Sequence, residues 1–258
     1  MIVGPHNWLV DLDESTETSL PTTADGYEAS NLWSGGTATA WRSVSASVFP
    51  FRFHLDTDRP VGLAAVFGLQ ASAGATITSV TVRTDTVWPT VTGTILGSIT
   101  PNERGDGALV VPIPITAESW SIWVQLDTPA LLTVGGLWLG EGRVLPAPTR
   151  ITSTRQSNRI RNVSEGMTHR STRIASPTRA LSIEWPALED DDAEAVMGAF
   201  DDVADGEGQC VLIPDEDDAS ELYYGAPADL ISATADAGMQ LNEGLVLDFE
   251  EDGRALGV

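Results

Sequence analysis

The residues best suited to acid–base or nucleophilic catalysis are scattered along this chain. Its three histidines, His6, His54 and His169, lie in different segments, and no Gly-x-Ser-x-Gly motif marks a nucleophilic serine. One cysteine and three histidines do not supply the grouped Cys and His ligands of a zinc site. The sequence therefore indicates neither a catalytic triad nor a zinc centre.

Carboxylates are the abundant reactive group, with 37 Asp and Glu in 258 residues. Three acidic clusters, Asp190–Asp192, Asp201–Gly206 and Asp215–Asp218, offer the oxygen ligands that calcium prefers. None has the spacing of a calcium-binding loop: counted from Asp201, Val203 stands at the third position and Leu212 at the twelfth. No pair of acids is singled out as the acid and base of a glycosidase. We therefore predict a protein that is not an enzyme and needs no metal or cofactor.

The arginines have the more unusual distribution. All 14 basic residues are arginine, and eight of them lie between Arg143 and Arg179 with a single acid, Glu165. Residues 180–258 contain 22 acids and one arginine, and residues 1–142 contain 14 acids and five arginines. A short basic segment therefore joins two acidic parts of the chain.

This charge pattern favours a protein partner for the arginines. A net charge of −23 disfavours sequence-specific binding of nucleic acid, which needs a basic face. The arginine fork instead matches a carboxylate in a bidentate pair of fixed geometry. We predict that the segment contacts carboxylates of a neighbouring subunit. The predicted subunit-contact residues are Arg150, Arg155, Arg159, Arg161, Arg170 and Arg173.

The strand pattern predicts a mainly β fold in four parts. Residues 1–25 form an N-terminal arm that docks on a neighbour, or else an edge strand of the chain's own first domain. Residues 26–142 form a β-sandwich, because short runs rich in Val, Ile, Thr and Trp alternate there with turn residues. Residues 143–179 form an arginine-rich ribbon, and residues 180–258 form a small acidic α+β domain.

Some segments carry more specific predictions. Pro60–Leu69 is almost continuously apolar and is expected to be a central buried strand. The tryptophans of Ser119–Leu126 and Gly136–Leu139 are expected to pack on one core. Thr149–Thr154 and Asn158–Val163 alternate polar and branched residues and are expected to form a hairpin or an extended ribbon.

One helix is expected, over Asp190–Val203. The apolar residues at helical spacing there form one stripe, Ala193, Val196, Met197 and Phe200. The acids Glu189 to Asp192 lie at its start, where negative charge stabilises a helix by interacting with the positive end of its dipole.

Three further observations concern the compartment. The chain contains no apolar run of 18 residues that predicts a membrane span, and Met1–Trp8 does not have the pattern of a secretory signal. The lone Cys210 excludes a disulfide within the chain. These features indicate folding in a reducing cytoplasm.

Two short motifs carry a resemblance to a known architecture. Ala29–Trp33, followed by Trp41-Arg42-Ser43, resembles the opening of the galactose-binding-like jelly rolls found in phage tail proteins. The resemblance covers residues 26–142 and implies a jelly-roll sandwich. It also implies glycan contacts from loops at one end of the sandwich. The implied contact residues are Trp33, Trp41, Arg42 and Trp88.

The order of elements after Arg179 resembles the tube-like barrel with one packed helix of phage tail tube and distal tail proteins. The order of the two domains departs from that family, because the jelly-roll-like part comes first here. The resemblance implies a structural virion protein of the phage tail tip or baseplate, made in the host cytoplasm. It would form a ring of three or six copies with other tail proteins, around a channel whose acidic wall lets DNA pass.

Two other classes of function remain open. The alternative is a carbohydrate-binding adhesin that recognises a host surface glycan through residues 26–142. A hydrolase acting on cell-wall polysaccharide is the third class, which would require a pair of carboxylates in a cleft.

Overall fold

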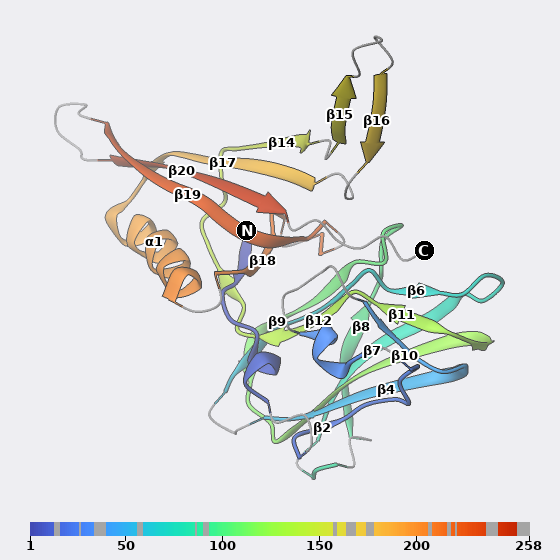
Figure 1. Ribbon diagram of the computed structural model, residues 1–258. Coiled ribbons are helices and arrows are strands. Elements are labelled where there is room, and N and C mark those ends of the chain that lie inside the picture. Colours follow the sequence, from blue (N-terminus) through green and yellow to red (C-terminus); the bar gives the residue numbers. More distant parts are fainter. Residues whose placement is uncertain are drawn as a thin grey trace.

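The protein is mainly β. The computed structural model describes residues 1–12, 16–25, 27–33, 40–55, 59–85, 87–89, 93–156, 159–163, 169–173, 178–205, 208–215, 218–219, 221–235 and 242–251. These residues form five antiparallel sheets, one α-helix and two short 3-10 helices, η1 (Trp8–Asp11) and η2 (Ala29–Leu32) (Figure 1). The predicted mainly β class with one helix is confirmed for this part of the chain. No helix in it is long and apolar enough to cross a membrane.

The first part of the chain is a β-sandwich of two main layers. One layer is a five-stranded sheet in the order β2 (Thr18–Ser19), β4 (Ala46–His54), β10 (Ser119–Ala130), β7 (Ile77–Asp85) and β8 (Thr94–Ile99). The other is a three-stranded sheet in the order β12 (Gly136–Gly140), β5 (Val61–Phe67) and β9 (Gly107–Ile115). A small third sheet consists of β3 (Trp41–Arg42), β11 (Leu132–Val134) and β6 (Gln70–Ala71).

Alternation along the strands builds the core between these layers. On β4 the three phenylalanines Phe49, Phe51 and Phe53 are buried, while the residues between them are partly exposed. They pack in one cluster with Trp120, Ile122 and Val124 of β10 and with Val61, Val66, Leu137 and Leu139 of the opposite layer. A period of two puts successive side chains on opposite faces of a sheet, so each strand has one face in this core.

The second part of the chain is a seven-stranded sheet with one helix. Its order is β13 (Arg143–Val144), β1 (Ile2–Gly4), β18 (Cys210–Ile213), β19 (Tyr223–Ala235), β20 (Asn242–Glu251), β17 (Thr178–Leu188) and β14 (Arg150–Gln156). Helix α1 (Asp190–Asp205) packs against it. The edge strands β13 and β14 are not paired with each other within the described residues, so this sheet is open there.

Helix α1 follows the predicted stripe. Ala193, Val196 and Phe200 are buried, and Met197 packs beside them against Leu181 and the other apolar residues of the sheet. Three aspartates lie in its first turn, where their negative charge interacts favourably with the positive end of the helix dipole. The predicted helix is therefore confirmed, with an observed end at Asp205.

The N-terminal strand β1 is an interior strand of the second sheet. Ile2 pairs with Val144 on one side and with Ile213 on the other. Residues 1–25 were expected to be an arm on a neighbour or an edge strand. Only Thr18–Ser19 lies at an edge, beside β4, whereas β1 is buried because its apolar residues lie between two cores.

The N-terminal segment then crosses the sandwich at β12. Asn7 forms an isolated bridge with Gly140, and a Cβ at Gly140 would lie 1.9 Å from the carbonyl oxygen of His6. The Asn7 side chain donates to the carbonyl of Leu137 and accepts from the amide of Leu139, each at 3.1 Å. Only glycine at position 140 permits this close crossing.

Strand β5 joins the two parts, because both of its faces are buried. All seven residues from Val61 to Phe67 are buried, which confirms the expected central strand. Leu63, Ala65 and Phe67 face away from the sandwich core and pack with Trp138 and a group from the second part. That group consists of Ile2, Val211, Ile213, Leu222 and Tyr224. The ring of Tyr224 lies 5.2 Å from that of Phe67 and 6.0 Å from that of Trp138.

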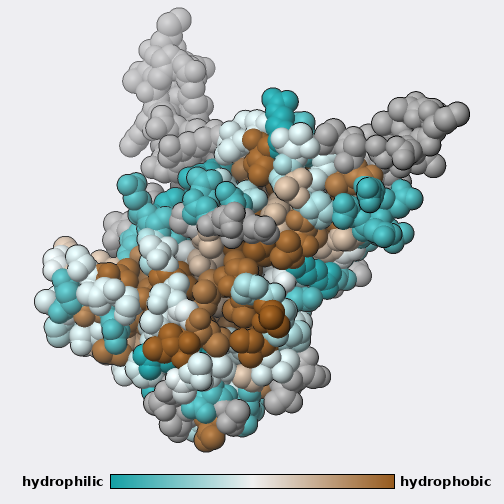
Figure 2. All heavy atoms as spheres, turned by 180° about the vertical axis from the view of Figure 1, so that it is seen from behind, coloured by the Kyte–Doolittle hydropathy of each residue, from teal (hydrophilic) through white to brown (hydrophobic). Residues whose placement is uncertain are grey.

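Apolar surface is also visible outside the cores. Figure 2 shows it gathered in the middle of the face opposite to that of Figure 1. Among the most exposed large apolar side chains are Ile113 on β9, at 80%, and Ile95 on β8, at 55%. The two prolines of β9, Pro112 and Pro114, lack the backbone N–H that a further strand would need there.

Two details of pairing differ from the expectations. In the arginine ribbon, β14 pairs with β17, and β15 (Arg159–Val163) pairs with β16 (His169–Arg173), so the expected hairpin partners are not neighbours. The tryptophans of β10 and β12 do not share a core: Trp120 lies in the sandwich core, Trp138 in the cluster between the two parts, and Trp123 on the outer face. Trp120 and Trp123 are three residues apart, an odd spacing that puts them on opposite faces of a strand.

Removal of the Phe67 ring is expected to destabilise both parts together. Phe67→Ala takes a large buried side chain from the cluster between them, which costs about 3–5 kcal/mol of unfolding free energy. Urea unfolding followed by circular dichroism should show one transition shifted to lower denaturant. Ile113→Ala, at an exposed position, is the control and should shift it by less than about 0.5 kcal/mol. Two separate transitions, with only one displaced, would contradict this account.

Candidate functional site

The outer face of the five-stranded sheet carries the most distinctive group of polar side chains. Ser121 of β10 lies directly between Arg52 of β4 and Arg83 of β7 in the strand register. All three alternate with core residues, so they point away from the sandwich core. Trp123, two residues after Ser121, shares this face and is partly exposed. This group, Arg52, Arg83, Ser121 and Trp123, is called the arginine–tryptophan site below.

Both arginines lie over the ring of Trp123. The guanidinium carbon of Arg83 is 4.4 Å from the ring centre, and that of Arg52 is 5.6 Å from it. Such contacts attract a cation to the electron-rich face of the indole. The indole is itself held, because its Nε1 donates a 2.8 Å hydrogen bond to the hydroxyl of the buried Ser121. The tryptophan therefore fixes where the two guanidinium groups lie.

The arginine stems are buried while the side chains as a whole remain partly exposed. The Nε atoms of Arg52 and Arg83 are inaccessible to solvent and form no hydrogen bond in the described part of the chain. The donors left for a ligand are consequently at the guanidinium ends. Each end offers a planar pair of N–H groups, which suits carboxylates and adjacent hydroxyls.

The next row of the sheet does not form a catalytic triad. Ser119 lies between His54 and Asp85 in the register, whereas a triad needs the histidine between serine and acid. The Ser119 hydroxyl is buried without a hydrogen bond, and Nδ1 of His54 lies 2.9 Å from the carbonyl oxygen of Glu118. Trp88 lies beside His54, with ring centres 5.5 Å apart. This row borders the arginine–tryptophan site.

The predicted glycan contacts do not come together. Trp41 is fully buried, packs on Phe51 and donates to Thr23 Oγ1 at 3.0 Å. Trp33 is 8% exposed and packs edge-on against Phe53. Neither ring offers a face on which a sugar could stack, because both complete the sandwich core.

The other two predicted contacts lie apart from each other. Arg42 is on β3, over the ring of Tyr27, and its Nε donates to Thr133. Trp88 is partly exposed at the border of the arginine–tryptophan site. Of the four residues, Trp88 alone therefore lies near the group that the structure singles out.

The predicted subunit-contact arginines are described mainly through their backbone. Arg150 is exposed, with an Nη1 4.0 Å from a carboxylate oxygen of Glu184 in its own chain. Arg155 of β14 lies opposite Arg179 of β17. In the β15–β16 pair, Arg159 lies opposite Arg173, Arg161 opposite Ser171, and Arg170 opposite Asn162. The side chains of Arg155, Arg159, Arg161, Arg170 and Arg173 lie outside what the structure describes.

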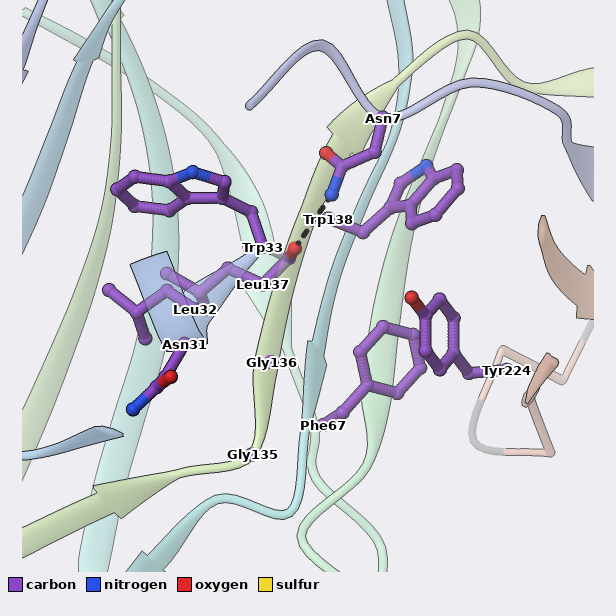
Figure 3. A pocket seen from close by; sticks show the side chains of 10 residues that line it. All are labelled: Asn7, Asn31, Leu32, Trp33, Phe67, Gly135, Gly136, Leu137, Trp138 and Tyr224. Atoms are coloured by element: carbon purple, nitrogen blue, oxygen red, sulfur yellow. Dashed lines mark hydrogen bonds between the residues drawn. The ribbon is translucent and has the colours of Figure 1, made fainter. Parts of the chain in front are cut away.

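A small cavity lies between the two parts of the molecule. Asn7, Trp33, Phe67, Trp138 and Tyr224 are among the residues that line it (Figure 3). Its volume is about 20 Å³, which is room for a water molecule. Ligand pockets have volumes of roughly 300–1,000 Å³, so this cavity is too small for a sugar ring.

The described residues contain no group of three or more His, Cys, Asp or Glu that could hold a metal ion. Cys210 is fully buried in β18, and this burial raises the pKa of its thiol. A thiol kept protonated is neither a nucleophile nor a metal ligand. Cys210 is therefore a core residue.

Comparisons with known proteins give distant similarities. No family model and no curated protein matches the chain. Chitosan-binding module 1 of a chitosanase/glucanase from Paenibacillus sp. IK-5 matches with a TM-score of 0.43 and 18% identity, over 53% of this chain and 99% of the module. A fucolectin from the serum of striped bass, Morone saxatilis, matches with a TM-score of 0.36 and 11% identity, over 92% of this chain and 91% of the lectin. Similarities at this level identify neither a family nor a ligand.

Sequence reasoning missed the arginine–tryptophan site. Trp123, Arg52 and Arg83 lie on three strands that are adjacent only in the folded sheet. The available signal was alternation: Trp123 falls between the apolar Ile122 and Val124, which marks it as a tryptophan on the outer face of a half-buried strand.

Trp41→Ala is expected to act through stability. Loss of this fully buried ring should lower the unfolding free energy by about 3–5 kcal/mol. Trp88→Ala, at a partly exposed position, should cost about 1 kcal/mol. Urea unfolding of both variants checks this difference. A Trp41→Ala protein of unchanged stability would show that the ring is not part of the core.

Proposed function

We propose that this chain is a non-enzymatic carbohydrate-binding protein whose ligand lies on the outer face of the five-stranded sheet. The observation that carries the proposal is the arginine–tryptophan site, in which two arginines lie over one indole at 4.4 and 5.6 Å. Sugars present closely spaced hydroxyl groups and apolar ring faces. The fork-shaped donors of the two arginines, held in place by the indole, match those hydroxyl groups.

The position of the site on a sheet supports this proposal. Three adjacent strands, β4, β10 and β7, hold its residues through continuous backbone pairing. Binding loses less conformational entropy when the donors are fixed beforehand by packing. The indole–Ser121 hydrogen bond and the buried arginine stems provide that fixation here.

Trp123→Ala is expected to weaken binding on a glycan array. The substitution removes the surface on which both guanidinium groups lie, so the affinity for the best glycan should fall about tenfold or more. Trp8→Ala is a matched control, because Arg59 lies 5.4 Å from the Trp8 ring outside this sheet. Circular dichroism confirms that each variant is folded. Wild-type protein that binds no glycan, or a Trp123→Ala variant that binds like wild type, would refute the proposal.

A second candidate function is a structural role in the tail tip or baseplate of a tailed phage. The observation in its favour is the open seven-stranded sheet, whose edge strand β14 carries Arg150 and Arg155. Unpaired edges can be completed by a strand from a neighbouring subunit. Strands β15 and β16 pair only with each other among the described residues and carry four further arginines (Figure 1).

In this second candidate the sandwich is an outward-facing jelly roll, and the seven-stranded sheet with helix α1 is a tube-like domain. Three or six copies would form a ring in the virion together with other tail proteins. The net charge of −23 would repel DNA from the channel wall and let it pass without sticking. Chains of this kind are made in the host cytoplasm before assembly.

Charge reversal in the ribbon tests the second candidate. Arg155→Glu, Arg159→Glu and Arg161→Glu in one protein should abolish self-association at low salt, because the arginines are proposed to meet carboxylates of a neighbour. The measurement is mass by light scattering of full-length protein. Arg59→Glu controls for charge reversal outside the ribbon. A monomeric wild type, or a triple variant that associates as the wild type does, would count against a ring.

A further inference from the structure

We infer that the arginine–tryptophan site selects sugars that carry a negative charge, such as a uronate, a sialic acid or a sulfated sugar. This inference rests on the proposed carbohydrate-binding function. It adds the chemical class of the ligand, which the charges around Arg52 and Arg83 indicate.

Among the residues that the structure describes, Arg52 and Arg83 have no acidic partner. The chain has 37 acidic residues and 14 arginines, so a guanidinium readily finds a carboxylate. Arg59 pairs with Asp11 at 3.0 Å, Arg104 with Asp106 at 2.9 Å, and Arg143 with Glu141 at 3.1 Å. Arg52 and Arg83 form no ion pair within the described residues.

Arg59 and Arg83 both lie over tryptophan rings but differ in their ion pairing. Arg59 lies over the Trp8 ring and also pairs with Asp11, so its charge is balanced within the chain. Arg83 lies over the Trp123 ring at a shorter distance and pairs with no acid in the described part of the chain. Contact with an indole therefore does not prevent a guanidinium group from also pairing with a carboxylate.

The site places two like charges at one ring. Arg52 and Arg83 flank the same residue, Ser121, and approach the same ring. Two guanidinium groups that contact one ring carry like charges that repel each other, and a bound anion offsets that repulsion. A neutral sugar accepts their hydrogen bonds but leaves the repulsion in place.

The geometry of the free donors suits an anionic group. The Nε atoms are buried and unpartnered, so the guanidinium ends are what a ligand can reach. The planar ends of arginine match the two oxygens of a carboxylate or sulfate group. A single anionic substituent of a sugar can thus be held by one fork.

The test uses oligosaccharide pairs that differ in charge. Full-length protein is titrated calorimetrically with oligogalacturonides and their methyl esters, with sialyllactose and lactose, and with sulfated and unsulfated galactose oligomers. At least one acidic member should bind about tenfold or more tightly than its neutral counterpart, the value of one charge-assisted hydrogen bond. Raising the ionic strength from about 0.05 M to about 0.5 M should weaken the acidic member selectively.

Variants locate the preference. Arg52→Gln with Arg83→Gln should bring the acidic and neutral members to about equal affinity. Arg59→Gln, which alters the balanced arginine, should leave the ratio unchanged. Arg83→Lys keeps the charge but removes the fork, and should retain only part of the preference. Thermal unfolding shows whether each variant is folded. The ratio of acidic to neutral affinity in the wild type tests the inference even if a variant does not fold.

The outcomes separate this inference from the function on which it rests. Equal affinity of the wild type for every acidic and neutral pair rejects the inference and leaves carbohydrate binding in place. The absence of binding to any oligosaccharide rejects both. Loss of self-association in the double glutamine variant, with no change in sugar binding, would assign the arginines to carboxylates of a second copy and overturn the inference.

Discussion

The burial of strand β5 on both faces is the constraint on which the rest of the structure depends. From Leu63 to Phe67 alternate positions serve different cores: Ala64 and Val66 lie in the sandwich core, and Leu63, Ala65 and Phe67 lie in the cluster with the second sheet. Strand β1 has the same property, because Ile2 faces that cluster while Val3 faces helix α1. The five-stranded sheet, the three-stranded sheet of β5 and the seven-stranded sheet are therefore stacked, and none of the three can move without exposing apolar surface.

This stacking leaves the five-stranded sheet with the sandwich's free outer face. Strands β5 and β12 of the opposite layer are covered by the second sheet, so they have no free face for a ligand. On the free face, Ser121 and Trp123 of β10 hold Arg52 and Arg83 from the neighbouring strands. The candidate site and the stability of the fold thus use opposite faces of the same strands.

Several features could be predicted from local sequence. The apolar run that became β5, the stripe of helix α1 and the acids in its first turn all follow from the period and composition of short segments. The predicted glycan contacts Trp33 and Trp41 failed for a related reason: a tryptophan near a turn looks the same in sequence whether it faces a core or a ligand. Only the tertiary contacts of these rings with Phe53 and Phe51 of β4 place them inside.

The sequence by itself determined the mainly β class, the one described helix, the central strand and the separation of charge along the chain, because each depends on residues close together in sequence. The tertiary structure decided that β1 enters the second sheet, that β14 pairs with β17 and not with β15, and that Arg52 and Arg83 meet over Trp123. These contacts join residues far apart along the chain. Their formation depends on which strands become neighbours, and that is settled by the packing of all the layers at once.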